Sequence, residues 1–150
     1  MESLFNSETH QDILKRLNNL NENSTALWGK MNIGQMFKHC QLPIKVALGE
    51  NNMEMKVGFI KKQIFKLFKP MMYSVKPWKH NMQTAKEFII TEPLVFESER
   101  TNLVTLINEF ASKKDHTNWP EHPVFGYFTT EQRGKMQYKH IDHHLRQFGA

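Results

Sequence analysis

The 150-residue chain is predicted to be all-α, an up-down four-helix bundle with one additional short lysine-rich amphipathic helix. Three observations predict this fold class. Apolar residues recur at spacings of three and four in five stretches, which is the periodicity of amphipathic helices. Glycine and proline are sparse, at 7 and 6 residues. Period-two alternation is scarce, so strands are not expected, and long amphipathic helices favour a bundle.

The first two helices are indicated by their apolar stripes and their end signals. One is expected over about 9–20, with apolar residues at Ile13, Leu14, Leu17 and Leu20. The next should begin near Asn32, a good N-cap, and end near Gly49, which suits a C-terminal stop. Pro43 lies inside it and predicts a bend, because proline removes a backbone donor and crowds the preceding turn.

The middle of the chain is predicted to hold the short lysine-rich helix. It should run from Val57 to about Phe68 and end before Pro70. Its predicted inward residues are Val57, Ile60, Ile64, Leu67 and Phe68. A short extended piece is expected over 88–90. A further helix is expected over about 96–112, with inward residues Leu103, Leu106, Ile107 and Phe110.

The last helix has the clearest boundaries. Thr129 and Gln132 have the spacing of a capping box, so the helix should open at Thr129 or Thr130. It should run to about Phe148, where Gly149 follows as a stop.

Composition restricts the compartment and the class of protein. Hydrophobic content of 39% and charged content of 23% are ordinary for a soluble globular chain, and the length suits a single domain over 1–150. Cys40 is the only cysteine, so no internal disulfide can form and a cytoplasmic setting is expected. There is no secretory signal pattern and no run approaching about 18 apolar residues, so no membrane span is expected.

The net charge of +5 is concentrated in one segment. Eight lysines and no acidic residue lie between Met55 and Lys86. Nucleic-acid binding is not expected, because the charge is local and lysine lacks the bidentate fork that suits base readout. Three readings of the lysine-rich helix stay open: a solvated lysine face with its apolar stripe on the bundle, a lid or dimer surface, and a membrane-surface helix.

Three histidines lie within five positions of the last helix. At about 100° per residue, His140 and His144 share a face one turn apart, beside the core-facing stripe. His143 falls toward solvent with Lys135, Lys139 and Arg146. The wheel therefore selects His140 and His144 as a converging pair.

His39 is the third candidate. It lies in the apolar sector of the second helix, where a neutral imidazole needs a polar partner. Two histidines from one helix and one from another make three neutral nitrogen donors, a set that Zn²⁺ uses in catalytic sites. Nickel, iron and manganese also accept imidazole, so these ligands do not define the metal.

Three motifs strengthen this interpretation. They are Trp28-x-x-Met31-x-x-x-Gln35-Met36-x-x-His39, His122-Pro123-x-Phe125-Gly126-x-x-Thr129 and Lys139-His140-x-Asp142-His143-His144-x-x-Gln147-Phe148-Gly149. Together they resemble the DinB-like metal-binding four-helix bundles, and more narrowly a branch known mainly as a domain of unknown function. The resemblance runs from about Leu4 to the end of the chain.

The resemblance implies a divalent metal held by one histidine on the second helix and an H-x-x-x-H pair on the fourth. Carried over, these are His39, His140 and His144. One departure is that relatives often carry tryptophan where Gln132 or Arg133 stands, which affects the expected pocket mouth. The superfamily contains thiol-dependent transferases and isomerases, members of no known activity, and many dimers.

Two classes of function follow from these residues. One is a metal-dependent enzyme acting on a small molecule, by hydrolysis or by transfer to a low-molecular-weight thiol. The other is a non-catalytic metal-binding or structural protein. Arg133 and Gln137 are candidates for substrate contact, Cys40 for the core, and His122 for holding the turn that follows it. No general base can be named.

Overall fold

The computed structural model describes residues 2–50 and 58–150 of the chain. It contains five α-helices and one 3-10 helix: α1 (Ser7–Asn18), α2 (Ile33–Leu48), α3 (Phe59–Tyr73), η1 (Lys86–Phe88), α4 (Phe96–Ser112) and α5 (Thr130–Gln147). Within the described ranges there is no strand, and an isolated bridge joins His122 to Gly126. The all-helical prediction is therefore confirmed. No described helix is long and apolar enough to cross a membrane.

The ends of α2 and α5 follow their capping residues. Asn32 and Gln35 form a capping box at the start of α2, and Gly49 ends the helix at a φ of +80°. Thr129 and Gln132 form the same arrangement at the start of α5. In each box two backbone N–H groups donate to the side chains of the opposite residue, so both predicted starts are confirmed.

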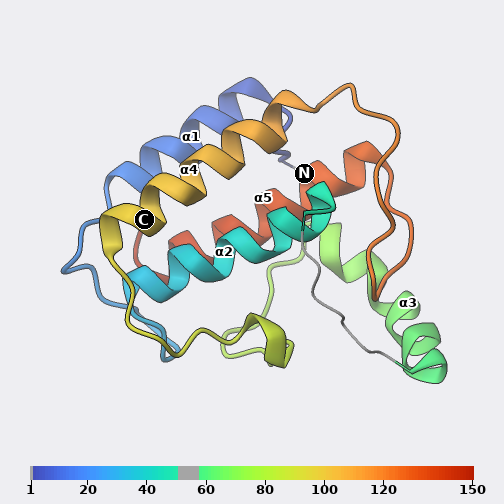
Figure 1. The fold of residues 1–150 in the computed structure, drawn as a ribbon, viewed down its shortest axis with the longest axis horizontal. Helices are drawn as coiled ribbons and strands as arrows, with labels where there is room; N and C mark the ends of the chain where they lie inside the picture. The colour runs from blue at the N-terminus through green and yellow to red at the C-terminus, as the bar shows by residue number, and fades with distance from the viewer. Residues whose placement is uncertain (1, 51–57) are drawn as a thin grey trace.

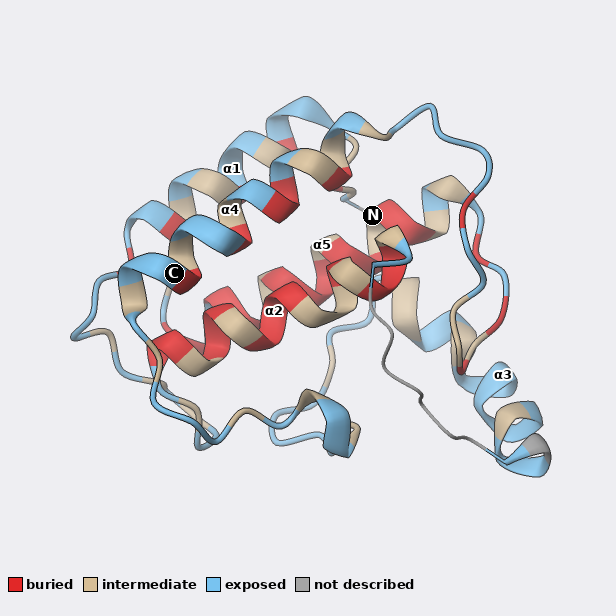
Figure 2. Cartoon of the chain, in the orientation of Figure 1, coloured by how far each residue is buried: buried red, intermediate tan, exposed pale blue. Residues whose placement is uncertain are grey.

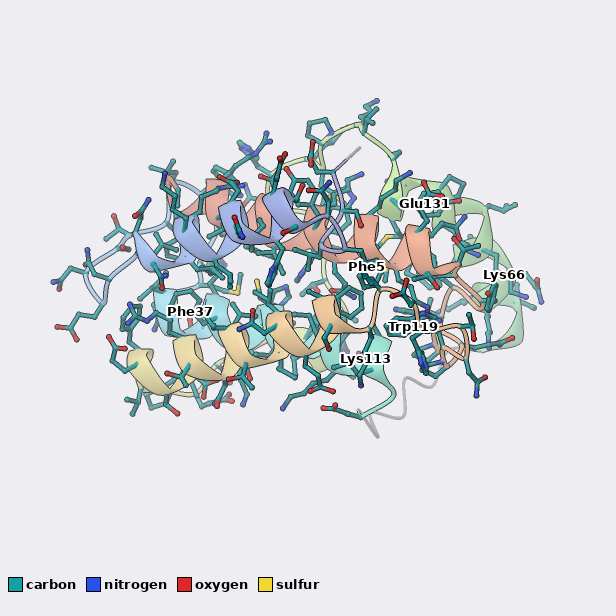
Figure 3. The ribbon with its side chains drawn as sticks, turned by 90° about the horizontal axis from the view of Figure 1, so that it is seen from above. Phe5, Phe37, Lys66, Lys113, Trp119 and Glu131 are labelled. Carbon is teal, nitrogen blue, oxygen red and sulfur yellow. The ribbon has the colours of Figure 1, made fainter. Side chains whose placement is uncertain are left out.

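Helices α1, α2, α4 and α5 surround the buried core (Figures 1 and 2). Seen from above, Phe37 lies between the helices, and Phe5 and Trp119 lie together at one end (Figure 3). Phe5 also stacks on Phe110, with ring centroids 4.8 Å apart. The N-terminal segment crosses α5 at Gly134, whose carbonyl accepts a hydrogen bond from the Leu4 amide.

Helix α3 lies outside this core, and two predictions about it are wrong. Its predicted start at Val57 lies outside the described residues, but its end does not come before Pro70, which stands inside the helix. Its predicted inward stripe is instead exposed: Ile60, Ile64, Leu67 and Phe68.

A lysine on α5 explains why α3 extends past Pro70. The Lys139 ammonium donates to the carbonyls of Met71 and Ser74, at 2.6 and 2.9 Å. These contacts supply donors to the last turn of α3, where carbonyls have no intrahelical partner. The last turn is thus stabilised beyond Pro70. Lys139 itself is buried, so the prediction that it faces solvent is also wrong.

The segment between α3 and α4 is largely irregular. Residues 88–90 form no strand, because Phe88 ends the 3-10 helix Lys86–Phe88 and Ile89 follows as its C-cap. The extended piece predicted there is therefore wrong at Phe88. This placement matters because the Phe88 carbonyl is turned toward α2.

Candidate metal centre

Three histidines from two helices converge between α2 and α5. His39 lies in the second turn of α2, on its buried face, and His140 and His144 lie one turn apart on α5. The centroids of the three rings are 4.7–5.0 Å apart. The structure therefore places together the three residues that the sequence predicted as ligands.

The distances between their nitrogens suit a common ion. The Nε2 atoms of His39 and His140 are 3.1 Å apart. One nitrogen from each of the three rings lies within 4.8 Å of the others. Two nitrogens bound to one tetrahedral ion at about 2.0–2.1 Å are roughly 3.3 Å apart. The Nε2 atoms of His39 and His140 are therefore already close to the spacing of a coordinated pair.

Two of the imidazole rings are oriented by oxygen atoms that accept hydrogen bonds from their Nδ1 atoms. Nδ1 of His39 donates to the Phe88 carbonyl at 2.8 Å, and Nδ1 of His144 donates to Oε1 of Gln147 at 2.8 Å. The Gln147 amide is oriented in turn, because its nitrogen donates to the Trp28 carbonyl at 2.6 Å. These oxygens only accept, so Nδ1 of both rings carries hydrogen and each Nε2 keeps its lone pair. Metal-binding histidines are characteristically held in this way.

His140 is the ring with an incomplete set of partners. Its Nδ1 is buried and has no hydrogen-bond partner among the described residues. Its Nε2 faces the Nε2 of His39, whose lone pair is directed inward. An ion bound at this Nε2 would leave Nδ1 as the hydrogen-bearing nitrogen, so His140 differs from His39 and His144 in having no oxygen that accepts from its Nδ1.

Burial keeps the three imidazoles neutral. It lowers the pKa of His39, although the hydrogen bond to Phe88 acts in the opposite direction. Burial and the neighbouring His144 and His39 hold the pKa of His140 well below its ordinary value. Burial, with a smaller effect from His39, lowers the pKa of His144 to about 3. Neutral nitrogens bind metals without first losing a proton, so the site is ready for an ion near neutral pH.

A cavity of about 270 Å³ lies beside the cluster. Trp78 and His143 are part of its lining and also approach the cluster: Trp78 is 5.9 Å from His140, and His143 is 5.1 Å from His144, between ring centroids. Trp28 and His80 stack at 3.8 Å on the same cavity. Trp78 and His143 thus lie between the cavity and the cluster, and none of the three clustered histidines lines the cavity itself.

Several other sequence predictions have clear outcomes. Cys40 is buried in the core as expected, and burial raises the pKa of its thiol. Nδ1 of His122 accepts hydrogen bonds from the amides of Val124 and Phe125, so its role in the turn is confirmed.

Two residues predicted as candidates for substrate contact serve the fold instead. The Arg133 guanidinium is buried and donates to the carbonyls of Phe128 and Pro120. The Gln137 amide is buried and donates to the Pro43 carbonyl at 3.1 Å. Both side chains are directed at main-chain oxygens, so the expectation that they contact substrate is not supported.

The sequence interpretation missed the roles of three parts of the site. Gln147 could have been found, because a residue three positions after His144 shares its helical face. Trp78 and the Phe88 carbonyl could not, because they come from irregular chain whose course no periodicity predicts.

A family model described as "Protein of unknown function (DUF1569)" matches residues 3–150. The chain belongs to this family. No curated protein and no solved structure matches it significantly. The match covers α1 to α5 and all three clustered histidines, so the centre lies within the family domain.

Proposed function

We propose that this DUF1569 protein is a divalent-metal-dependent enzyme acting on a small molecule, with His39, His140 and His144 as the metal ligands. One observation carries the proposal: three buried imidazoles converge, and two of them are already held with Nε2 directed inward. The ligand order, one on α2 and an H-x-x-x-H pair on α5, also supports membership of the DinB-like superfamily. We extend the proposal to its single-domain, up-down four-helix bundle, formed here by α1, α2, α4 and α5.

The donor set favours Zn²⁺ and is compatible with nickel, iron and manganese. Three neutral nitrogens leave at least one coordination position open, as in catalytic zinc sites. A bound ion would supply Lewis acidity, either to a water or to a thiol. His39, His140 and His144 would hold the ion, and the Phe88 carbonyl and Gln147 orient two of the rings.

The adjacent cavity is the proposed substrate site. Its volume suits a small molecule, and Trp28 and Trp78 give it apolar walls. Lys139 and Arg146 add positive charge to the lining, and Glu2 and Asp142 add negative charge. Both hydrolysis and transfer to a low-molecular-weight thiol are consistent with such a lining.

Metal content tests the ligand assignment. Purified chain loaded with Zn²⁺ should bind one equivalent, and His140→Ala should bind far less, because two ligands remain. His143→Ala is the matched control: it removes an adjacent histidine outside the cluster and should leave stoichiometry unchanged. Unchanged metal content in the His140 variant would refute the assignment.

A structural metal site is the second candidate, and the burial of the cluster favours it. His39, His140 and His144 are only 4%, 8% and 7% exposed. A metal that only stabilises the fold would raise the melting temperature, and the loaded protein would be inactive against hydrolytic and thiol-transfer substrates. Activity that is lost with chelator and restored by metal supports the enzyme instead.

A further inference from the structure

The face of α3 that points away from the rest of the molecule is apolar. At about 100° per residue, five exposed side chains fall within an arc of roughly 100°. We call this set the α3 apolar arc; it consists of Ile60, Ile64, Leu67, Phe68 and Met71. Figure 2 shows the exposed helix beside the buried core.

The opposite face of α3 attaches the helix to the molecule. The ring of Phe65 packs edge-on against Phe125, with centroids 6.1 Å apart, and Tyr73 packs against Phe128 at 6.2 Å. Lys69 lies over the Phe128 ring, 4.6 Å from its centroid. Since these contacts hold the helix by one side, the α3 apolar arc is left facing solvent.

Positive charge surrounds the arc. Lys61 is exposed and borders it on the helical wheel. Lys76 and Lys79, which follow the helix, are also exposed, and no acidic residue occurs from Met55 to Lys86. Glu121 is the acidic residue that lines the cavity between α3 and the following turn, where Lys62, Lys66 and Lys69 face it. The charge that borders the arc is therefore positive, and the other lysines of α3 lie on its attached face.

We propose that α3 docks on an anionic lipid surface, with the α3 apolar arc among the acyl chains and the lysines at the headgroups. Such a surface supplies an apolar layer and negative charge together, which matches both properties of this helix. A second copy of the chain would match only the apolar character of the helix. Pairing two arcs would bring two sets of lysines within a Debye length of each other, where they repel. The 15 residues of α3 are too few to span a bilayer, so the helix lies in the interface.

Vesicle sedimentation tests this proposal with the full chain. At low salt the protein should sediment with vesicles of phosphatidylcholine and phosphatidylserine, and not with phosphatidylcholine alone. High salt should release it, because the headgroup attraction is screened. Lys61→Gln should weaken binding about fivefold, and Lys61→Arg should preserve it.

A pair of double variants isolates the apolar arc. Ile64→Ser with Leu67→Ser should weaken vesicle binding by at least about tenfold, since two inserted side chains are lost. Leu27→Ser with Val95→Ser is the matched control, because these apolar side chains are also exposed but lie outside α3. It should bind as the unchanged chain does. All four positions are exposed, so melting temperatures should stay close to that of the unchanged protein.

Three results would overturn the proposal. The first is no sedimentation with anionic vesicles at low salt, and the second is equal binding to neutral vesicles. The third is full binding by the α3 double variant. A dimer in solution that this variant dissociates, with no vesicle binding, would assign the arc to a second copy of the chain.

Discussion

Helices α3 and α5 contact each other, yet their apolar faces have opposite surroundings. Leu145 on α5 is fully buried, whereas Leu67 on α3 is 79% exposed. Both helices are amphipathic by sequence. The difference teaches that periodicity defines which side chains share a face, while packing partners from other elements decide whether that face is covered.

The largest expected difference in stability comes from replacing one leucine by alanine in each of the two helices. Leu145→Ala should lower the free energy of unfolding by about 2–5 kcal/mol, because it leaves a cavity in the core. Leu67→Ala should change it by less than about 0.5 kcal/mol, because that side chain contacts mainly solvent. Urea denaturation measures both. Similar losses in the two variants would mean that α3 is covered in solution.

Two glycines extend the comparison. A Cβ at Gly134 on α5 would overlap Ser3 and Phe5, whereas a Cβ at Gly58, which precedes α3, would meet no atom of the described residues within 4 Å. Gly134→Ala should therefore cost about 1–3 kcal/mol, and Gly58→Ala should be nearly neutral. Thermal melts would show the difference. A neutral Gly134 variant would indicate that the N-terminal segment does not pack on α5.

This comparison also shows how far the sequence could predict the molecule. The ends of α2 and α5 were predictable, because capping residues act locally at Asn32, Gly49 and Thr129. The burial of His39 was predictable from its apolar sector, and the pairing of His140 with His144 was predictable from their spacing beside the core-facing stripe. The outward face of α3 and the capping role of Lys139 were not, because they depend on contacts between segments far apart in sequence.

Replacing Gln147 on α5 tests the orientation of the candidate ligands, and a glutamine on α3 provides the control. Gln147→Met removes the oxygen that accepts from His144 and should weaken zinc binding by about 10–100-fold, at most about 2.7 kcal/mol. Gln147→Glu keeps an acceptor and should retain most of the affinity. Gln63→Met on exposed α3 is the control and should not alter binding. Competition with a chelating dye gives the affinities, and full affinity in Gln147→Met would exclude this positioning role.

The smallest expected effect concerns the turn that lies between the two helices. Burial, together with the charges of Arg133 and Lys62, lowers the pKa of His122 to about 4, against about 6.5 in an unfolded chain. Between these values the unfolded state binds more protons. The stability that neutral His122 contributes is therefore present above about pH 6.5 and is lost as the pH falls toward 4.

His122→Asn should reduce this dependence. Asparagine does not titrate, and its side-chain oxygen can accept from the same amides. In metal-free protein, the fall in melting temperature between pH 7 and pH 4 should be shallower than in the unchanged chain. His116→Asn, at an exposed position, serves as the control. An equally steep fall in both variants would contradict the assignment.

The hydrogen bonds that orient His39 and His144 end on backbone carbonyl oxygens, and this has one further consequence. His39 donates a hydrogen bond to the carbonyl of Phe88, and the Gln147 amide that orients His144 donates to the carbonyl of Trp28. Every amino acid has a backbone carbonyl, so replacing Phe88 or Trp28 need not remove these acceptors. The side chains at positions 88 and 28 can therefore vary during evolution while the imidazoles keep their orientation. Sequence comparison alone would overlook these two carbonyl acceptors. The exception is Gly29, where any larger residue would collide with the Gln147 amide.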